Sequence, residues 1–217
     1  MSSRATETLL RELARELEPV QPIPKLRSTL IAVVSLWLIA VLLDAWTGGP
    51  PPAIAGRNLA FVGVLLGLIS ASAGATLAAL AGAVPGRGDE AKWGRALAVA
   101  GLVLAAGVSL WAVAQVEAAA SGVPWATSLA CIRRATVLGI LPALLVCAFL
   151  ARAWARKPLV GAGLAATGCV ALGSVAVHLS CPAGAGLHVL LGHAFAPLVT
   201  TAILALPLAG LVVYFRR

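Results

Sequence analysis

Six long apolar windows run through the chain and restrict it to one class of fold. They cover Ser28–Trp46, Leu59–Val84, Ala96–Val116, Ala135–Ala151, Leu159–Leu179 and His188–Tyr214. Each window is close to the roughly 20 residues that cross about 30 Å of hydrocarbon as a helix. A segment in lipid must pair its own backbone groups, as a helix does. Soluble domains are about one quarter charged, whereas this chain is 11% charged. The sequence therefore predicts an all-α polytopic membrane bundle of six transmembrane helices.

Basic residues fall mostly on one side of these six spans. With residue 1 placed in the cytoplasm, thirteen of the 16 Lys and Arg residues lie on the cytoplasmic side. Only Arg57, Arg133 and Arg134 lie on the outer side, which satisfies the positive-inside rule. We therefore expect a multi-pass membrane protein with both termini in the cytoplasm. The same bias accounts for the net charge of +8, so the charge gives no reason to expect direct nucleic-acid binding.

The first 27 residues form the only sizeable stretch outside the spans, and we divide the chain into residues 1–27 and a membrane unit of residues 28–217. The pattern over Thr6–Glu18 predicts an amphipathic helix, which a proline-rich connector follows. Four leucines form its apolar stripe: Leu9, Leu10, Leu13 and Leu17. Surface-bound helices favour Lys and Arg on the polar face, whereas this helix has more Glu than Arg. A groove on a partner protein is therefore favoured over the bilayer surface as its binding site.

Topology brings two of the four cysteines to the same membrane face. Cys131 precedes the fourth span and Cys181 follows the fifth, so both are expected at the outer face. Cys147 and Cys169 fall within spans, where a thiol behaves as a small hydrophobic group. For the outer pair, the sequence leaves three interpretations open: a disulfide in an oxidising compartment, a metal site, and simple packing.

All three histidines lie close to Cys181. His178 is three positions before it, and His188 and His193 follow a short loop rich in Pro and Gly. Imidazole and thiolate ligands suit Zn²⁺, copper and softer metals such as Cd²⁺. Together with Cys131, these residues are candidate ligands of an outer-face metal ion. The alternative is that each histidine makes an ordinary hydrogen bond at a helix end.

The remaining acidic groups near the membrane favour structure over catalysis or transport. Asp44 and Glu117 lie near the outer ends of the first and third spans. Arg57, Arg133 and Arg134 are available there, so we expect a structural ion pair. No nucleotide-binding loop, Ser/His/Asp set or pair of catalytic carboxylates is present in the sequence, and we do not expect an enzyme.

The second span carries a small residue at every fourth position. This ladder consists of Gly63, Gly67, Ala71, Ala75, Ala79 and Ala83. Such spacing lets helix backbones approach closely within a membrane. We expect it to serve packing within the bundle more than oligomerisation, although the sequence leaves the oligomeric state open.

Taken together, the chain resembles the NrsF family of bacterial anti-sigma factors over almost its whole length. Three stretches carry the resemblance. The first is LLRELARELEPVQPIP (Leu9–Pro24), and the second is CIRR (Cys131–Arg134), with Pro142 further along the same helix. The third is HLSCP (His178–Pro182), which a histidine-containing start to the sixth span follows.

The resemblance implies a regulatory function in a bacterial inner membrane. The N-terminal segment would hold an extracytoplasmic-function sigma factor at the membrane, and Leu9, Leu10, Leu13 and Leu17 would contact it. Cys131 and Cys181 would sense a heavy metal or oxidative stress, with His178 assisting, and release the sigma factor. A small inner-membrane transporter of metal or another solute, with the same outer cluster as its entry site, is the alternative hypothesis.

Overall fold

A computed structural model describes residues 6–8, 12, 23, 25–48, 58–116, 125–182 and 186–216 of the protein. Within these ranges the chain is helical and contains no strand, and six helices are long and apolar enough to cross a membrane. The first five are α2 (Leu26–Gly48), α3 (Leu59–Ala83), α4 (Gly88–Val116), α5 (Trp125–Arg152) and α6 (Pro158–Ser180). The last consists of α7 (Gly186–Val189), the π-helical turn η2 (Leu190–Ala194) and α8 (Ala196–Tyr214). The prediction of an all-α polytopic bundle is confirmed.

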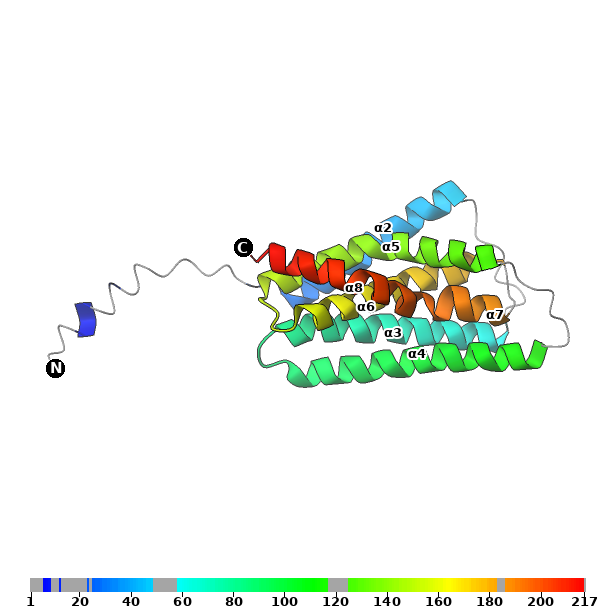
Figure 1. Ribbon diagram of the computed structural model, residues 1–217, viewed down its shortest axis with the longest axis horizontal. Coiled ribbons are helices and arrows are strands. Elements are labelled where there is room, and N and C mark those ends of the chain that lie inside the picture. The colour runs from blue at the N-terminus through cyan, green and yellow to red at the C-terminus, as the bar shows by residue number, and fades with distance from the viewer. Residues whose placement is uncertain are drawn as a thin grey trace.

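Helix α6 lies at the centre of the bundle. It packs against α3, α5 and α8 (Figure 1), and 67% of its most apolar window is buried. Small residues allow this packing, because a Cβ added at Gly173 would lie 2.1 Å from the carbonyl oxygen of Ala135 on α5. On the opposite side, a Cβ at Gly168 would lie 2.5 Å from the Thr76 hydroxyl on α3. The central position of α6 therefore depends on glycine at its contacts.

The small-residue ladder on α3 serves packing within the bundle, as predicted. A Cβ at Gly67 would lie 2.7 Å from the Ala105 nitrogen of α4, and one at Gly101 on α4 would lie 2.4 Å from the Ala71 nitrogen. The α3 and α4 backbones are therefore in direct contact along one edge of the bundle (Figure 1).

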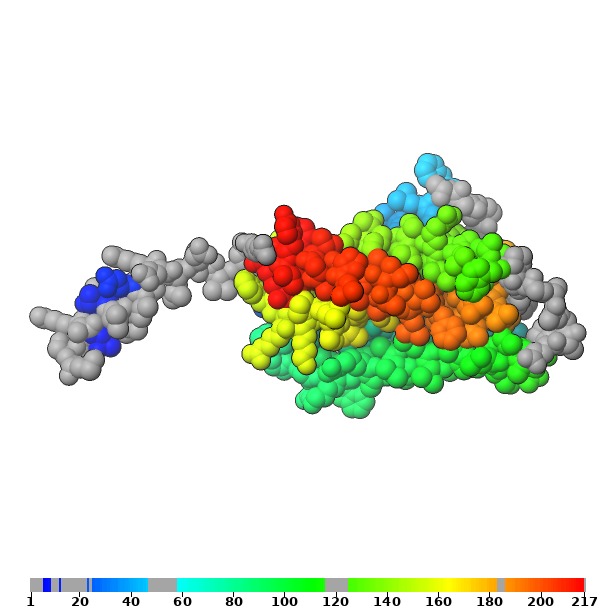
Figure 2. Space-filling model, in the orientation of Figure 1, coloured from blue at the N-terminus to red at the C-terminus, as the bar shows by residue number. Residues whose placement is uncertain are grey.

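Helix α2 lies at the other edge and is the least embedded of the six. It contacts α5 and, more weakly, α6, and only 11% of its apolar window is buried. In the space-filling view its C-terminal part projects from the body of the molecule (Figure 2). Large apolar side chains such as Leu42 and Leu43 are more than half exposed, as expected for a helix that faces lipid.

Helix α5 begins earlier than the sequence predicted. We expected the fourth span to start at Ala135, after Cys131, but the helix starts at Trp125 and Cys131 lies within it. Polar residues such as Arg133 and Arg134 lower the hydropathy of this stretch without interrupting its backbone hydrogen bonds. The cysteine therefore lies nearly two turns inside a regular helix, which fixes the direction of its side chain.

The two ends of the bundle differ in charge, and we name them accordingly. The end where α2 begins and α5 and α8 end is the basic end, and its described cations are Lys25, Arg27, Arg87, Lys92, Arg95, Arg152, Arg156, Lys157 and Arg216. The opposite end is the cysteine end, with Arg133 and Arg134 as its described cations. Exposed aromatic residues occur at both, including Trp93 and Trp154 at the basic end and Trp46 and Trp125 at the cysteine end. Aromatic residues favour membrane–water interfaces, so each end lies at an interface.

The N-terminal helix falls almost entirely outside the described residues. Residues 6–8 and 12 are helical and exposed. The stripe of Leu9, Leu10, Leu13 and Leu17 lies outside the described ranges, and so does the Pro-rich connector, apart from isolated positions. Residue 27, the predicted boundary, lies in the first turn of α2. The partner-binding function of the stripe and the division into two units stay predictions.

Candidate metal centre

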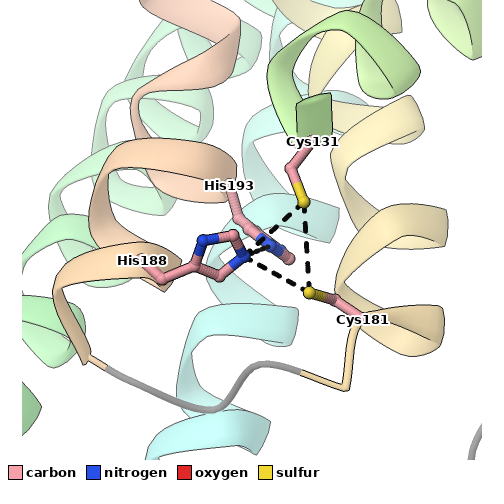
Figure 3. Close-up of side chains that lie close together, drawn as sticks. All are labelled: Cys131, Cys181, His188 and His193. Atoms are coloured by element: carbon pink, nitrogen blue, oxygen red, sulfur yellow. Dashed lines mark hydrogen bonds between the residues drawn. The ribbon is translucent and has the colours of Figure 1, made fainter. Parts of the chain in front are cut away.

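Four side chains from three segments converge at the cysteine end. Cys131 comes from the second turn of α5, Cys181 directly follows α6, His188 lies on α7 and His193 lies on η2 (Figure 3). One ligand atom from each residue lies within 4.8 Å of all the others. The sequence prediction that Cys131 and Cys181 share a membrane face agrees with this arrangement, because their sulfurs are 4.0 Å apart.

All of these atoms lie within 4.8 Å of one another, and four of their six separations are close to those of ligands around one tetrahedral ion. Zn²⁺ binds sulfur at about 2.3 Å and nitrogen at about 2.05 Å, so tetrahedral geometry separates two sulfurs by about 3.8 Å, sulfur and nitrogen by about 3.6 Å, and two nitrogens by about 3.3 Å. The two sulfurs lie 4.0 Å apart, and His188 Nε2 is 3.5 Å from Cys131 Sγ and 3.3 Å from Cys181 Sγ. The two Nε2 atoms of His188 and His193 are 3.3 Å apart. The residues therefore fit a Cys₂His₂ metal site.

A hydrogen-bond chain fixes which nitrogen of His193 faces the cluster. His178 Nε2 lies 3.2 Å from the Phe61 carbonyl oxygen of α3, and a carbonyl can only accept, so His178 Nε2–H is the donor. The neutral His178 ring then has a lone pair on Nδ1, which accepts from His193 Nδ1–H at 3.3 Å. His193 Nε2 is left with its lone pair directed at the cluster. Such outer hydrogen bonds orient histidine ligands in metal sites.

Ser128 performs the corresponding function for His188. Its hydroxyl is 3.1 Å from His188 Nδ1 and can either donate or accept. The opposite nitrogen, His188 Nε2, has both sulfurs and His193 Nε2 within 3.5 Å. A single N–H cannot satisfy three such neighbours, whereas a cation at the centre of the four atoms can.

A π-helical turn brings the two ligating histidines together. Residues five positions apart lie about 140° apart around an ordinary α-helix, which would place His188 and His193 on different faces. In η2 the Phe195 N–H instead donates to the Leu190 carbonyl five residues back, at 2.9 Å. Pro197 is a physical cause of this change, because it has no N–H for the His193 carbonyl. The rings of His188 and His193 consequently meet edge to face, with centroids 5.2 Å apart.

His178 lies behind this cluster, outside the set of four ligands. Its ring stacks on Phe61 with centroids 4.3 Å apart and an interplanar angle of 15°. Asn58 caps α3 and accepts from the Phe61 N–H at 3.0 Å, which holds the first turn of α3 in place. His178 therefore connects the histidine ligands to the start of α3.

The other side chains singled out in the sequence serve structure. Asp44 on α2 accepts two hydrogen bonds from Arg134 Nε, at 2.9 and 3.0 Å, and a further one from Arg134 Nη2. This confirms the predicted ion pair and joins α2 to α5 one turn away from Cys131. Cys147 and Cys169 are buried in an apolar cluster, as predicted, whereas Glu117 and Arg57 lie outside the described residues.

Sequence reasoning missed Ser128 and the hydrogen bond that the Phe61 carbonyl accepts from His178. Ser128 lies one helical turn before Cys131 and is 2% exposed. Once α5 is extended to Trp125, this i, i+3 spacing places Ser128 and Cys131 on one face. Sequence alone offers no signal for the Phe61 contact, because a backbone carbonyl carries no residue identity.

Comparison with protein families matches residues 13–213 to the family described as negative regulator of sigma F. Comparisons with curated proteins and with solved structures find no match. The matched region includes each of the four clustered residues and all six membrane-spanning helices, apart from the last residue of α8, Tyr214. The chain belongs to the NrsF family of negative regulators of a sigma factor.

Proposed function

We propose that the protein is an inner-membrane anti-sigma factor that releases its partner when a metal ion or an oxidant acts on the cysteine end. The N-terminal segment holds an extracytoplasmic-function sigma factor at the cytoplasmic face. Cys131, Cys181, His188 and His193 form the signal-receiving site on the opposite face. Family membership supports the regulatory part of this proposal.

The observation that carries the sensing step is the spacing of the four ligand atoms. They come from α5, the end of α6, and the α7–η2 segment, so an ion bound among them links three separate segments. The sulfur and nitrogen donors suit Zn²⁺, Cd²⁺ or copper. The two histidines are fully buried, whereas both cysteines are partly exposed, so an ion or oxidant reaches the site from the cysteine side.

Oxidation is the second signal that this geometry accommodates. An oxidant such as peroxide removes two electrons from the two thiols, which lose two protons and form one S–S bond. The sulfurs are 4.0 Å apart, and a disulfide needs about 2.05 Å. A small shift of Cys181 beyond the end of α6 covers this difference.

Transport of a metal ion is less well supported than regulation. A carrier needs polar groups along its path through the membrane. In the described part of the chain, the middle of the spans carries no Asp, Glu, Lys, Arg or His side chain to ligate a metal ion, and its buried polar groups are hydroxyls such as those of Thr76 and Thr167. The family match also concerns regulation of a sigma factor.

The experiment is co-purification of the sigma factor with full-length protein from membranes, with and without Cd²⁺. Wild type captures the sigma factor and releases it on addition of Cd²⁺. Leu13→Asp abolishes capture, because a buried carboxylate interrupts the apolar stripe. Cys131→Ser/Cys181→Ser captures the sigma factor but retains it in Cd²⁺.

A matched variant distinguishes an effect of the metal site from a general effect of removing two thiols. Cys147→Ser/Cys169→Ser removes the same number of thiols from the apolar core and is expected to release as wild type does. Release that depends on the core pair, or capture that is unaffected by Leu13→Asp, contradicts the proposal. Metal uptake into vesicles that persists after deletion of residues 1–20 would support the transporter instead.

A further inference from the structure

A pocket of about 270 Å³ lies at the basic end, on the opposite side of the membrane from the metal centre. It is lined by helices α3, α4 and α6 and by the connection between α5 and α6. Its walls include Ala78, Gly82 and Leu164, and its cationic residues are Arg95, Arg156 and Lys157. The volume is slightly below the roughly 300–1,000 Å³ typical of small-molecule sites, which suits one end of a larger ligand.

The charge of the pocket favours an anion. None of its three cations has a carboxylate within ion-pair distance among the described residues. Arg95 donates its Nε–H to the Ala91 carbonyl at 3.2 Å, which leaves its terminal nitrogens for a ligand. Of the nearby acids, Asp89 pairs with Lys92 at 3.0 Å and does not line the pocket.

The N-terminus of α6 adds a second favourable contact for an anion. Lys157 is the N-cap residue, and its side chain makes no capping hydrogen bond. Val160 and Gly161, in the first turn of this 23-residue helix, line the pocket. Pro158 has no N–H and the Gly161 N–H donates to the Lys157 carbonyl at 3.0 Å. The remaining first-turn N–H groups and the positive end of the helix dipole attract phosphate.

The depth of the pocket indicates that this anion belongs to a lipid. The floor lies one to two helical turns inside the spans, at Ala78 and Leu164, and is apolar. Trp93 and Trp154, at the same end of the bundle, are 76% and 68% exposed, as expected at the level of lipid headgroups. A soluble anion would contact only the cations, and the apolar floor of the pocket would stay exposed to water.

We propose that the pocket binds an anionic phospholipid. Arg95, Arg156, Lys157 and the N-terminus of α6 hold its phosphate, and the acyl chain packs against Val160 and Leu164. Basic pockets between membrane helices on the cytoplasmic side are suited to such headgroups. This site is independent of the metal centre and of sigma-factor binding.

The turn between α5 and α6 places two of the cations. Trp154 has a φ of 50°, a conformation rare for a bulky residue, and the Ala155 N–H donates to the Leu150 carbonyl at 3.1 Å. The Arg216 guanidinium donates to the Ala155 carbonyl. This turn therefore holds Arg156 and Lys157 over the pocket.

The test measures lipid retention on detergent-purified full-length protein by native mass spectrometry. The protein is mixed with phosphatidylglycerol, with phosphatidylcholine, or with inorganic phosphate. Wild type retains phosphatidylglycerol at least tenfold better than phosphatidylcholine. Each cation near an anionic headgroup contributes about fivefold, so Arg95→Gln/Arg156→Gln/Lys157→Gln removes this preference.

Two further variants distinguish a defined pocket from general attraction. Arg27→Gln/Arg87→Gln/Arg152→Gln removes the same charge from exposed positions at the same end, outside the pocket, and keeps the preference. Gly82→Leu fills the pocket and leaves every cation in place, and it abolishes retention. A Cβ at Gly82 meets its nearest atom at 3.8 Å, so this variant folds without a backbone clash.

Three outcomes overturn the proposal. One is an equal loss of the preference for phosphatidylglycerol in the two triple variants. Another is full retention of phosphatidylglycerol by the Gly82→Leu variant. The third is displacement of the lipid by millimolar inorganic phosphate or by a synthetic peptide of residues 6–18, which carries four glutamates. The pocket would then be a site for a soluble anion or for the acidic N-terminal segment.

Discussion

Replacement of His178 by alanine tests the hydrogen-bond chain behind the metal centre. His178 is not one of the four ligands, but its Nδ1 accepts from His193 Nδ1–H at 3.3 Å. His193 is fully buried, so His178→Ala leaves a buried N–H without its acceptor and frees the ring to rotate. The ion would then lose a correctly oriented ligand, although all four ligating residues remain.

The size of the effect follows from the cost of that buried group. An unsatisfied buried donor costs about 1–3 kcal/mol, which corresponds to roughly 5- to 150-fold in affinity. Removal of an outer hydrogen-bond partner in other metal sites weakens binding about 10–100-fold. We therefore expect the Kd for Zn²⁺ to rise by about one to two orders of magnitude.

The assay is competition for Zn²⁺ between detergent-purified protein and a chromophoric chelator. Ser174→Ala is the matched control, because Ser174 lies one turn before His178 on α6 and is fully buried, and its hydroxyl has no hydrogen-bond partner among the described residues. Thermal unfolding of both metal-free variants separates loss of affinity from loss of fold. A His178→Ala protein that binds Zn²⁺ within twofold of wild type, or a Ser174→Ala protein that is equally weakened, refutes the reasoning.

Three further predictions concern packing, the ion pair and the thiols. Gly173→Ala places a methyl group 2.1 Å from the Ala135 carbonyl oxygen and is expected to lower the free energy of unfolding by about 1–3 kcal/mol. Gly163→Ala, whose nearest contact is at 3.8 Å, should be much milder in the same denaturation assay, and the reverse order would be inconsistent with the packing. A double-mutant cycle with Asp44→Asn and Arg134→Gln should give a coupling of about 0.5–3 kcal/mol, and no coupling would exclude a stabilising ion pair. Zn²⁺ should protect the two site thiols from alkylation, which peptide mass spectrometry detects, and equal labelling with and without Zn²⁺ would contradict metal binding.

The sequence predicted the fold well because the dominant physical constraint acts on single segments. Each apolar window must form a helix on its own in lipid, and all six predicted spans correspond to helices of the structure. The charge bias and the order of the spans then predict which helix ends lie at the same membrane face. The same reasoning placed Cys131 and Cys181 at one end of the bundle, where their sulfurs are 4.0 Å apart.

The site was harder to predict because its geometry depends on deviations from regular helices. The pair of His188 and His193 requires the π turn, which changes the angle between residues five apart. Hydropathy gave no indication that α5 extends to Trp125, because Arg134 reduces the apolar character of that stretch while Asp44 neutralises its charge. Neither effect is visible until contacts between helices are known.

The distribution of tight and loose contacts indicates where a change at the metal centre is taken up. Helices α5 and α6 are in backbone contact at Gly139 and Gly173, where an added Cβ would lie within 2.6 Å of the facing carbonyl oxygen. Such close-packed contacts resist sliding, so Cys131 and the end of α6 form a stiff pair. His188 and His193 lie instead on η2 and its neighbouring turn, and π turns are frequent at functional sites. Helix α8 continues from η2 to the basic end, where Arg216 contacts the α5–α6 connection. A change in ligand spacing is therefore expected to be taken up at η2, from which α8 continues to the basic end.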